Sequence, residues 1–253
     1  MVTVSEEKPR LIELYHLLSY DEVDSTNEEA KRLALGGGAE GAVLWAKKQT
    51  AGRGRMGRSW VSEEGNLFVS ILLKPTTKEA NWPQLSFVTA LAVHDAILPM
   101  LETDPDLTLK WPNDILLKGK KVGGILLEMF ADESRQNWLT VGIGINIEDY
   151  PRDVMYPATC LKANGIEIVS AKIVLSRFLS CFMERYDRWI AEGFSSMQKE
   201  WQQHAYNLGK KISIATPRGE ISGVFTGIDV TGHLLLDQKG VILPVMAGDV
   251  TEA

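Results

Sequence analysis

Hydrophobic and polar positions follow two spacings along this chain, and the two spacings predict strands and helices. Short, β-prone apolar runs predict strands at residues 42–46, 67–73, 107–111, 115–117, 121–128 and 138–147. Apolar residues at helical spacing predict helices over residues 25–35, 83–101, 170–192 and 195–205. Because several strands follow one another at hairpin distance, we expect an α+β fold with a mixed, largely antiparallel sheet flanked by helices.

The chain before the first predicted strand offers two local signals. Residues 11–18 form one short amphipathic segment, which is too short for a helix-turn-helix module. Ser25 with Glu28, or Thr26 with Glu29, matches a capping box that opens the helix ending near Leu35. The two hydroxyl residues are then either caps alone or part of a helix N-terminus that binds a polar ligand.

The pattern changes after Gly209. Short β segments cover residues 211–215, 220–228, 233–236 and 240–244, with turn residues between them. This regular spacing predicts a small all-β barrel. We therefore expect a larger domain at residues 1–208 and a small β domain at residues 209–253.

A cationic, glycine-rich stretch from Gln49 to Trp60 lies between two predicted strands. Residues 52–58 hold three arginines and three glycines. Glycines let backbone amides approach an anion closely, and arginines offer planar forks that match phosphate or carboxylate oxygens. The stretch thus predicts a loop that binds a small polyanion, with a solvated basic loop as the alternative.

The glycines of this loop also spell the G-x-G-x-x-G dinucleotide fingerprint at Gly52, Gly54 and Gly57. That fingerprint requires a helix directly after the glycines. Here residues 62–66 are turn-like and a strand follows. The dinucleotide interpretation therefore fails on its context.

Glycines also interrupt two predicted strands, at Gly123-Gly124 and at Gly142 and Gly144. Each costs about 1 kcal/mol relative to alanine, so they make sense where a ligand lies against the backbone. Lys121 begins one of these strands, and its position beside the glycines favours a binding role over that of a solvated strand-end lysine.

Composition narrows the class of protein. The formal net charge of −6 argues against broad nucleic-acid binding. Two cysteines, Cys160 and Cys181, without C-x-x-C spacing make structural zinc and a disulfide framework poor hypotheses. The charged N-terminus and the lack of a bilayer-length apolar run predict a cytoplasmic protein.

Arginine guanidinium groups together with a lysine suit a site in which a nucleoside triphosphate reacts with an anionic partner. The sequence has no Walker A, H-E-x-x-H or G-x-S-x-G motif. Adenylation or phosphoryl transfer remains as the predicted chemistry.

These stretches resemble the biotin protein ligases in both order and spacing, over nearly the whole chain. The shared motifs are Ser25-Thr26-Asn27, Gly52-Arg53-Gly54-Arg55-x-Gly57-Arg58-x-Trp60, Lys110-Trp111-Pro112-Asn113-Asp114, Lys121 to Leu126 and Gly142 to Asn146. The resemblance implies a sheet like that of the class II aminoacyl-tRNA synthetases and an SH3-like C-terminal barrel. The related lipoate and octanoyl transferases share the fold but lack the arginine–glycine loop.

The resemblance implies a two-step ligase. Biotin and Mg·ATP give biotinyl-5′-adenylate, and a lysine of a biotin carboxyl carrier protein, part of acetyl-CoA carboxylase, then takes the biotinyl group. By matching position, the catalytic residues would be Lys121, Arg53, Arg55 and Asp114. Biotin would contact Ser25, Thr26, Asn27, Gln49, Gly52, Arg53, Gly54, Arg55, Lys121, Gly124 and Gly144. ATP or the adenylate would contact Arg53, Arg55, Arg58, Trp60, Lys110, Asn113, Asp114, Lys121 and Asn146. No residue set is assigned to a protein-bound metal, and Mg²⁺ is expected with ATP.

The resemblance also sets expectations about partners. Many bacterial relatives carry an N-terminal helix-turn-helix and act as repressors, whereas we expect this chain to be a monofunctional ligase that binds neither DNA nor membrane. Relatives often dimerise through the central sheet, which leaves a homodimer open. A lipoate-type ligase, a non-catalytic sensor and a DNA-binding repressor are the alternatives; a sensor would be expected to lose Lys121 or the arginines, and all are present.

Overall fold

The structure is a computed structural model that describes residues 15–101, 106–152, 154, 156–166, 170–216 and 219–252. Its α-helices are α2 (Thr26–Leu35), α3 (Leu85–Ile97), α4 (Ala171–Glu192) and α5 (Ser195–Gln203). Its strands are β1 (His16–Val23), β2 (Ala42–Gln49), β3 (Leu67–Leu73), β4 (Leu107–Lys110), β5 (Asp114–Leu117), β6 (Lys120–Ala131), β7 (Asn137–Ile145), β8 (Lys211–Thr216), β9 (Gly219–Ile228), β10 (Leu234–Gln238), β11 (Val241–Val245) and β12 (Asp249–Glu252).

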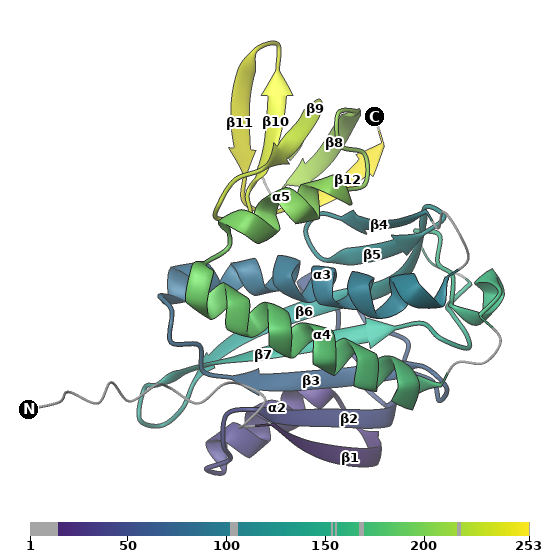
Figure 1. Cartoon of the computed structure of the whole chain (residues 1–253), viewed down its shortest axis with the longest axis vertical. Coiled ribbons are helices and arrows are strands. Elements are labelled where there is room, and N and C mark those ends of the chain that lie inside the picture. The colour runs from purple at the N-terminus through teal and green to yellow at the C-terminus, as the bar shows by residue number, and fades with distance from the viewer. Residues whose placement is uncertain are drawn as a thin grey trace, which may run out of the picture.

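A seven-stranded sheet forms the larger part of the molecule (Figure 1). Its strand order is β1-β2-β3-β7-β6-β5-β4, with β1 and β2 parallel and the other neighbours antiparallel. The predicted mixed, largely antiparallel sheet is confirmed. None of the helices in the described part of the chain combines the length and the hydropathy that a membrane-spanning helix needs.

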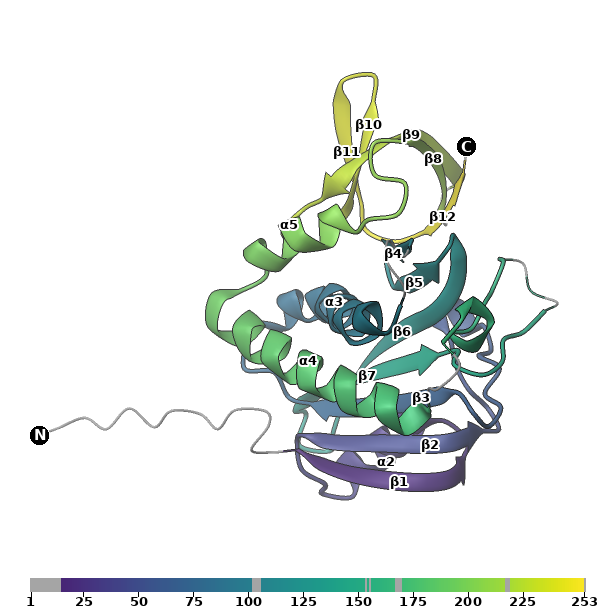
Figure 2. The same cartoon turned by 45° about the vertical axis from the view of Figure 1, so that its right-hand side comes forward.

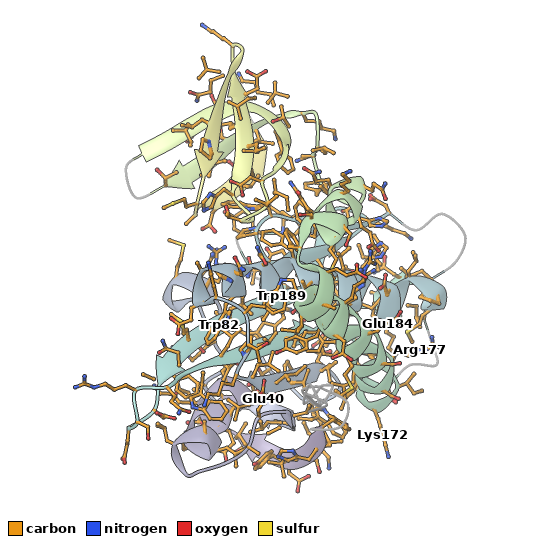
Figure 3. All side chains as sticks on the ribbon, turned by 60° about the vertical axis from the view of Figure 1, so that its left-hand side comes forward. Glu40, Trp82, Lys172, Arg177, Glu184 and Trp189 are labelled. Carbon is orange, nitrogen blue, oxygen red and sulfur yellow. The ribbon has the colours of Figure 1, made fainter. Side chains whose placement is uncertain are left out.

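Helices cover both faces of this sheet. Val43, Val69 and Ile71 face α3 and α4, while Leu44 and Leu72 pack with α2, because neighbouring residues of a strand point to opposite faces. In Figure 3, the labelled charged residues of α4, Lys172, Arg177 and Glu184, lie on its exposed side. The opposite stripe of α4 is apolar and buried, as its 3.6-residue period predicts.

The C-terminal strands form a second, wholly antiparallel sheet in the order β11-β10-β9-β8-β12. Figure 2 shows that it curls round into a barrel beyond α5. Trp111 Nε1 donates to the carbonyl of Gly232 at 2.9 Å, and Gln84 Nε2 donates to the carbonyl of Val230 at 2.9 Å. These contacts fix the barrel on the end of the larger sheet where β4 and β5 lie.

The pattern missed two strands, and one predicted capping bond is not formed. His16–Val23 is a strand, so the last residues of the predicted 11–18 segment belong to β1, and its earlier residues lie outside the described residues. The pattern also missed β12, whose four residues carry little periodicity. Ser25 is the N-cap of α2 by position but makes no side-chain capping bond, so a capping box at Ser25 is not formed.

Candidate functional site

A cavity of about 960 Å³ opens where the glycine-bearing strands β6 and β7 meet the N-terminus of α2, the arginine loop and β12. A volume of this size suits a drug-sized ligand or a nucleotide. The predicted residues that line it are Ser25, Thr26, Asn27, Gln49, Arg53, Gly54, Arg55, Arg58, Trp60, Lys110, Asn113, Asp114, Lys121, Gly124, Gly144 and Asn146. Segments separated by up to about two hundred residues thus converge on one space, while the roles assigned to them stay predictions.

Gly52 is not part of this lining. A Cβ atom at Gly52 would collide with Ser62 Oγ and with the carbonyl oxygen of Trp60. The carbonyl of Gly52 also accepts from Trp60 N–H at 2.9 Å. Gly52 therefore closes the base of the loop, and its predicted contact with biotin stays a prediction.

The arginine loop folds back on itself as a short hairpin. Arg53 and Ser59 form a β-bridge, and the N–H of Gly54 donates to the carbonyl of Arg58 at 2.7 Å. Met56 and Gly57 turn the chain at its tip, with φ of 56° and 73°. Since glycine adopts positive φ at no steric cost, Gly57 suits this turn, whereas Met56 is held in a conformation that L-residues rarely adopt.

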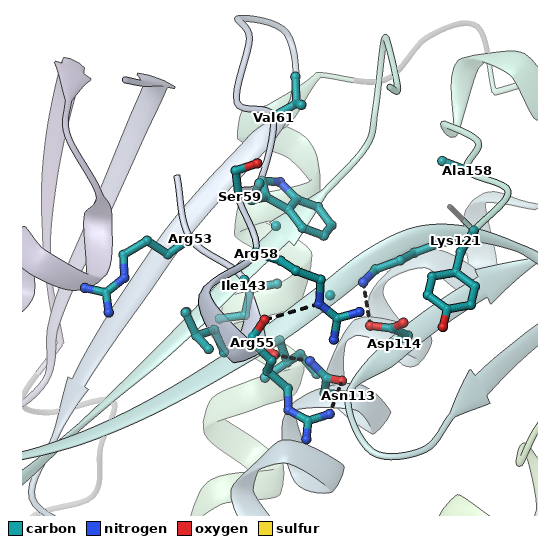
Figure 4. A pocket seen from close by; sticks show the side chains of 18 of the residues that line it. Arg53, Arg55, Arg58, Ser59, Val61, Asn113, Asp114, Lys121, Ile143 and Ala158 are labelled. Atoms are coloured by element: carbon teal, nitrogen blue, oxygen red, sulfur yellow. Dashed lines mark hydrogen bonds and ion pairs between the residues drawn. The ribbon is translucent and has the colours of Figure 1, made fainter. Parts of the chain in front are cut away.

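The three arginines of the loop point in different directions (Figure 4). Arg55 Nη1 donates to Asn113 Oδ1 at 3.2 Å, and burial lowers the pKa of Arg55 from its ordinary value. Arg58 Nη2 pairs with Asp249 Oδ1 of β12 at 3.0 Å. The loop therefore contacts both the larger sheet and the C-terminal barrel.

Arg53 lies apart from the other two arginines. It pairs with Glu28 of α2 and, at 2.8 Å, with Oε1 of Glu128 on β6. Figure 4 shows its side chain directed away from Arg55 and Lys121. In this arrangement Arg53 is neutralised by carboxylates and does not join a cationic cluster with Arg55.

Lys121 and Asp114 form the central charged pair of the cavity. The two residues lie on the adjacent strands β6 and β5, and Lys121 Nζ is 2.6 Å from Asp114 Oδ1. The same ammonium stands 5.2 Å from the centroid of the Trp60 ring, within cation–π range. A carboxylate and an aromatic face therefore hold the lysine over the glycine-bearing strands.

The interior glycines accommodate the side chain of Trp60. A Cβ at Gly144 would lie 2.5 Å from Trp60 Cε2, and one at Gly124 would lie 3.0 Å from Trp60 Cζ3. From the sequence we expect a ligand directly against this backbone. The structure instead puts an indole there, with its buried Nε1 lacking a hydrogen-bond partner.

A polar network surrounds the N-terminus of α2. Thr26 N–H donates to Gln49 Oε1 at 2.8 Å, and Gln49 Nε2 donates to Ser62 Oγ at 2.9 Å. Asn27 Nδ2 donates to Glu128 Oε2 at 2.8 Å. The backbone N–H of Thr26 and the side-chain amide of Asn27 are thus tied to β2 and β6, and both residues line the cavity.

Comparison with known proteins shows the family to which this chain belongs. The biotin/lipoate A/B protein ligase family matches residues 21–146, and the biotin protein ligase C-terminal domain matches residues 208–251. The chain is 37% identical over 240 residues to the bifunctional ligase/repressor BirA of Bacillus subtilis, covering 93% of this chain and 73% of that protein. It is 37% identical over 218 residues to a biotin–[acetyl-CoA-carboxylase] ligase of Paracoccus denitrificans, covering 84% of this chain and 90% of the relative.

The chain belongs to the biotin protein ligases. A solved biotin protein ligase from Aquifex aeolicus, in complex with biotin and ATP, superposes with a TM-score of 0.81 at 32% identity, covering 93% of this chain and 97% of that one. The match includes the barrel, so the SH3-like fold expected for the C-terminal strands is confirmed.

Two further predicted residues contact the segment 156–160 that walls the ligase cavity. Lys110 Nζ lies 4.7 Å from the ring centroid of Tyr156. Asn146 Nδ2 donates to the carbonyl of Thr159 at 3.0 Å, which commits one side of that amide to the fold. The oxygen and the second N–H of the Asn146 amide are then left to contact a nucleobase.

Several residues of this ligase site cannot be found from local sequence patterns. Asp249 follows Arg58 by 191 positions, so no local pattern connects the two. The strand pattern marks Glu128 only as the end of a strand, and Tyr156 follows a stretch without periodicity. Ser70 did carry a signal, because it is the polar residue inside the apolar strand Leu67–Leu73.

Proposed function

We propose that this protein activates biotin with ATP to form biotinyl-5′-adenylate and then transfers the biotinyl group to a lysine of a biotin carboxyl carrier protein. The observation that carries the proposal is a single cavity that contains the arginine loop, the Lys121–Asp114 pair and the polar N-terminus of α2. Family membership supports it, and so do relatives named as biotin–[acetyl-CoA-carboxylase] ligases.

In the first step, a carboxylate oxygen of biotin attacks the α-phosphorus of ATP, and the bond to pyrophosphate breaks. Both reactants are anions, so the site must offset their repulsion and align them. Lys121, held by Asp114 at 2.6 Å, would place its ammonium between the carboxylate and the α-phosphate. Arg55, fixed by Asn113, would hold the phosphates from the loop side.

In the second step, a neutral lysine ε-amine of the carrier attacks the acyl carbon of the adenylate. The acyl–phosphate bond breaks, AMP leaves, and the amine nitrogen loses one proton to solvent. Lys121 would stabilise the negative charge that returns to the phosphate. The carboxylate of Asp114 would remain close to the reacting centre once its partner shifts toward the phosphate.

Two predicted roles need a movement away from the arrangement in the structure. Trp60 must leave part of the surface over Gly124 and Gly144 before biotin or adenine can lie there. Arg53 must exchange Glu28 and Glu128 for the ligand carboxylate if it is to join the clamp. The hairpin carries both residues, so one loop rearrangement would serve both, and it would exclude water from the labile adenylate.

We expect Mg²⁺ to enter with the triphosphate and to neutralise part of its charge. We place the catalytic domain at residues 1–208 and the β domain at 209–253. The two free cysteines accord with the cytoplasmic location expected from the sequence.

The test is ATP–pyrophosphate exchange with the purified protein in the presence of biotin, lipoate or octanoate. We expect exchange with biotin alone, and its loss in Lys121→Ala. Lys120→Ala is the matched control, because Lys120 is the exposed neighbour of Lys121 and does not line the cavity. Exchange that requires lipoate would move the substrate to the sister family, and exchange with none of the acids would overturn the ligase proposal.

A further inference from the structure

A hydroxyl group is buried inside the central sheet behind the N-terminus of α2. Ser70 has no exposed surface and lies on β3, opposite Gly142 of β7. Its Oγ is 2.6 Å from Asn27 Oδ1 and 2.7 Å from Thr26 Oγ1. A buried hydroxyl is costly unless it is hydrogen-bonded, so this contact with two predicted ligand-binding residues requires an explanation.

The orientation of the Asn27 amide follows from its neighbours. Glu128 Oε2 lies 2.8 Å from Asn27 Nδ2, and the other oxygen of the same carboxylate pairs with Arg53. An ionised carboxylate only accepts hydrogen bonds, so the NH₂ group of Asn27 must face Glu128 and its oxygen must face Ser70. Gly142 makes this possible, since a Cβ there would collide with Asn27 Oδ1.

The single proton of Ser70 is therefore committed. Asn27 Oδ1 cannot donate, so Ser70 donates to it and has no proton left for Thr26. The Thr26 proton then goes to Ser70 Oγ at 2.7 Å or to Gln49 Oε1 at 3.1 Å. Both acceptors belong to the protein, so in either arrangement Thr26 Oγ1 turns only lone pairs toward the cavity.

We propose that Ser70 and Glu128 are positioning residues that keep the Thr26 proton inside the protein and thereby make Thr26 Oγ1 an obligate hydrogen-bond acceptor for the ligand. An acceptor at this position selects a ligand that carries an N–H donor. The inference rests on the proposed function, because the ureido ring of biotin supplies such donors whereas the dithiolane ring of lipoate has none. Neither Ser70 nor Glu128 needs to touch the ligand.

The experiment measures ATP–pyrophosphate exchange with biotin and with the two isomers of biotin that are methylated on one ureido nitrogen. Ser70→Ala removes the nearer acceptor of the Thr26 proton and leaves only the longer contact to Gln49 Oε1. The proton can then turn toward the ligand, where two donors would face each other. We expect the KM for biotin to rise about tenfold with kcat changed less than twofold, as for loss of a single acceptor in a buried site. For the isomer that has no N–H toward Thr26, the same substitution should change KM less than twofold.

Glu128→Gln tests the other end of the network, and Glu28→Gln is its matched control. Both glutamates pair with Arg53, but the structure shows a bond to Asn27 only from Glu128. Glu128→Gln should therefore raise the KM for biotin beyond the change that Glu28→Gln produces. It also carries the test if Ser70→Ala fails to fold, which thermal unfolding would reveal.

The outcomes separate the two proposals. Absence of biotin-dependent exchange in the wild-type protein would overturn the proposed function itself. Normal wild-type exchange, with Ser70→Ala raising KM equally for biotin and for both methylated isomers, would show a merely structural role and overturn the inference. So would an unchanged KM in a folded Ser70→Ala protein, or equal effects of the two glutamate variants.

Discussion

Gly144→Ala is predicted to loosen the arginine loop before any ligand binds. The added methyl carbon would lie 2.5 Å from Trp60 Cε2 and 2.6 Å from Trp60 Nε1. Ordinary van der Waals contact begins at 3.4 Å, so the indole must retreat by about 1 Å. Trp60 is anchored in the hairpin by its bond to Gly52, and the movement therefore passes to the whole loop.

The size of the effect follows from the cost of overpacking. An extra methyl in a well-packed contact costs about 1–3 kcal/mol. Because about 1.4 kcal/mol is a factor of ten, the open population of the loop should rise about 5- to 150-fold. Gly124→Ala should do the same more weakly, since its Cβ would lie 3.0 Å from Trp60 Cζ3.

Limited trypsin digestion of the protein without added ligands measures this opening directly. The loop contains Arg53, Arg55 and Arg58, and cleavage after them requires the hairpin to open. When opening is fast relative to cleavage, the cleavage rate follows the open population. We expect cleavage to be fastest in Gly144→Ala, slower in Gly124→Ala and slowest in the wild type.

A double-mutant cycle with Trp60→Ala decides whether the reasoning is right. If Gly144 exists to accommodate the indole, then Gly144→Ala should add no further opening once the indole is gone. If the glycine serves the ligand alone, Gly144→Ala would leave the loop of the free protein as resistant as wild type and would raise only the KM for biotin or ATP. That second pattern would refute the proposed packing of Trp60 against Gly144 as the reason for the glycine.

Three further predictions follow from the charged groups. Lys121→Ala should lower the exchange kcat by about 10²–10³, as for loss of one preorganised electrostatic group, and a fall of less than tenfold would remove Lys121 from the chemistry. Asp249→Asn should raise the KM for ATP up to about fivefold with kcat retained, because the ion pair of Asp249 with Arg58 is partly exposed and is worth at most about 1 kcal/mol. Asp249→Glu should keep the KM of the wild type, since it retains the charge. The hydrogen bond from Arg32 lowers the pKa of Asp24 to about 2, below its ordinary value of 3.8. The stability that this bond adds is present above pH 3.8 and is lost as the pH falls toward 2. Between these pH values, the free energy of unfolding in urea should therefore fall less in Asp24→Asn than in the wild type, by under about 1 kcal/mol for this half-exposed pair. Identical pH profiles of the two proteins would contradict the prediction.

Sequence pattern predicted the main elements because their signals are local. The apolar run at residues 67–73 and the helical stripe from Val174 to Tyr186 each carry their period within one element. The pattern failed at β1 and β12. Polar residues such as Tyr20 and Asp21 interrupt β1, and β12 has four residues whose partner is the distant strand β8.

The composition of the site was also accessible from sequence, because glycines and arginines concentrated in one loop leave few chemical uses other than binding an anion. The directions of those arginines were not accessible. Arg53, Arg55 and Arg58 are near neighbours in the chain, yet they pair with Glu128, Asn113 and Asp249. Such pairings depend on which surfaces meet after folding, and no local rule specifies them.

By itself, the sequence determined the elements, the order of the motifs and the chemical character of the cavity, since these depend on residue type and short-range spacing. Only the tertiary structure decided that Trp60 covers the interior glycines, that the C-terminal barrel reaches Arg58, and that Ser70 meets Thr26 and Asn27 inside the sheet. The reason is physical. A strand pattern says which residues face inward, but long-range packing selects the side chain that each of them meets.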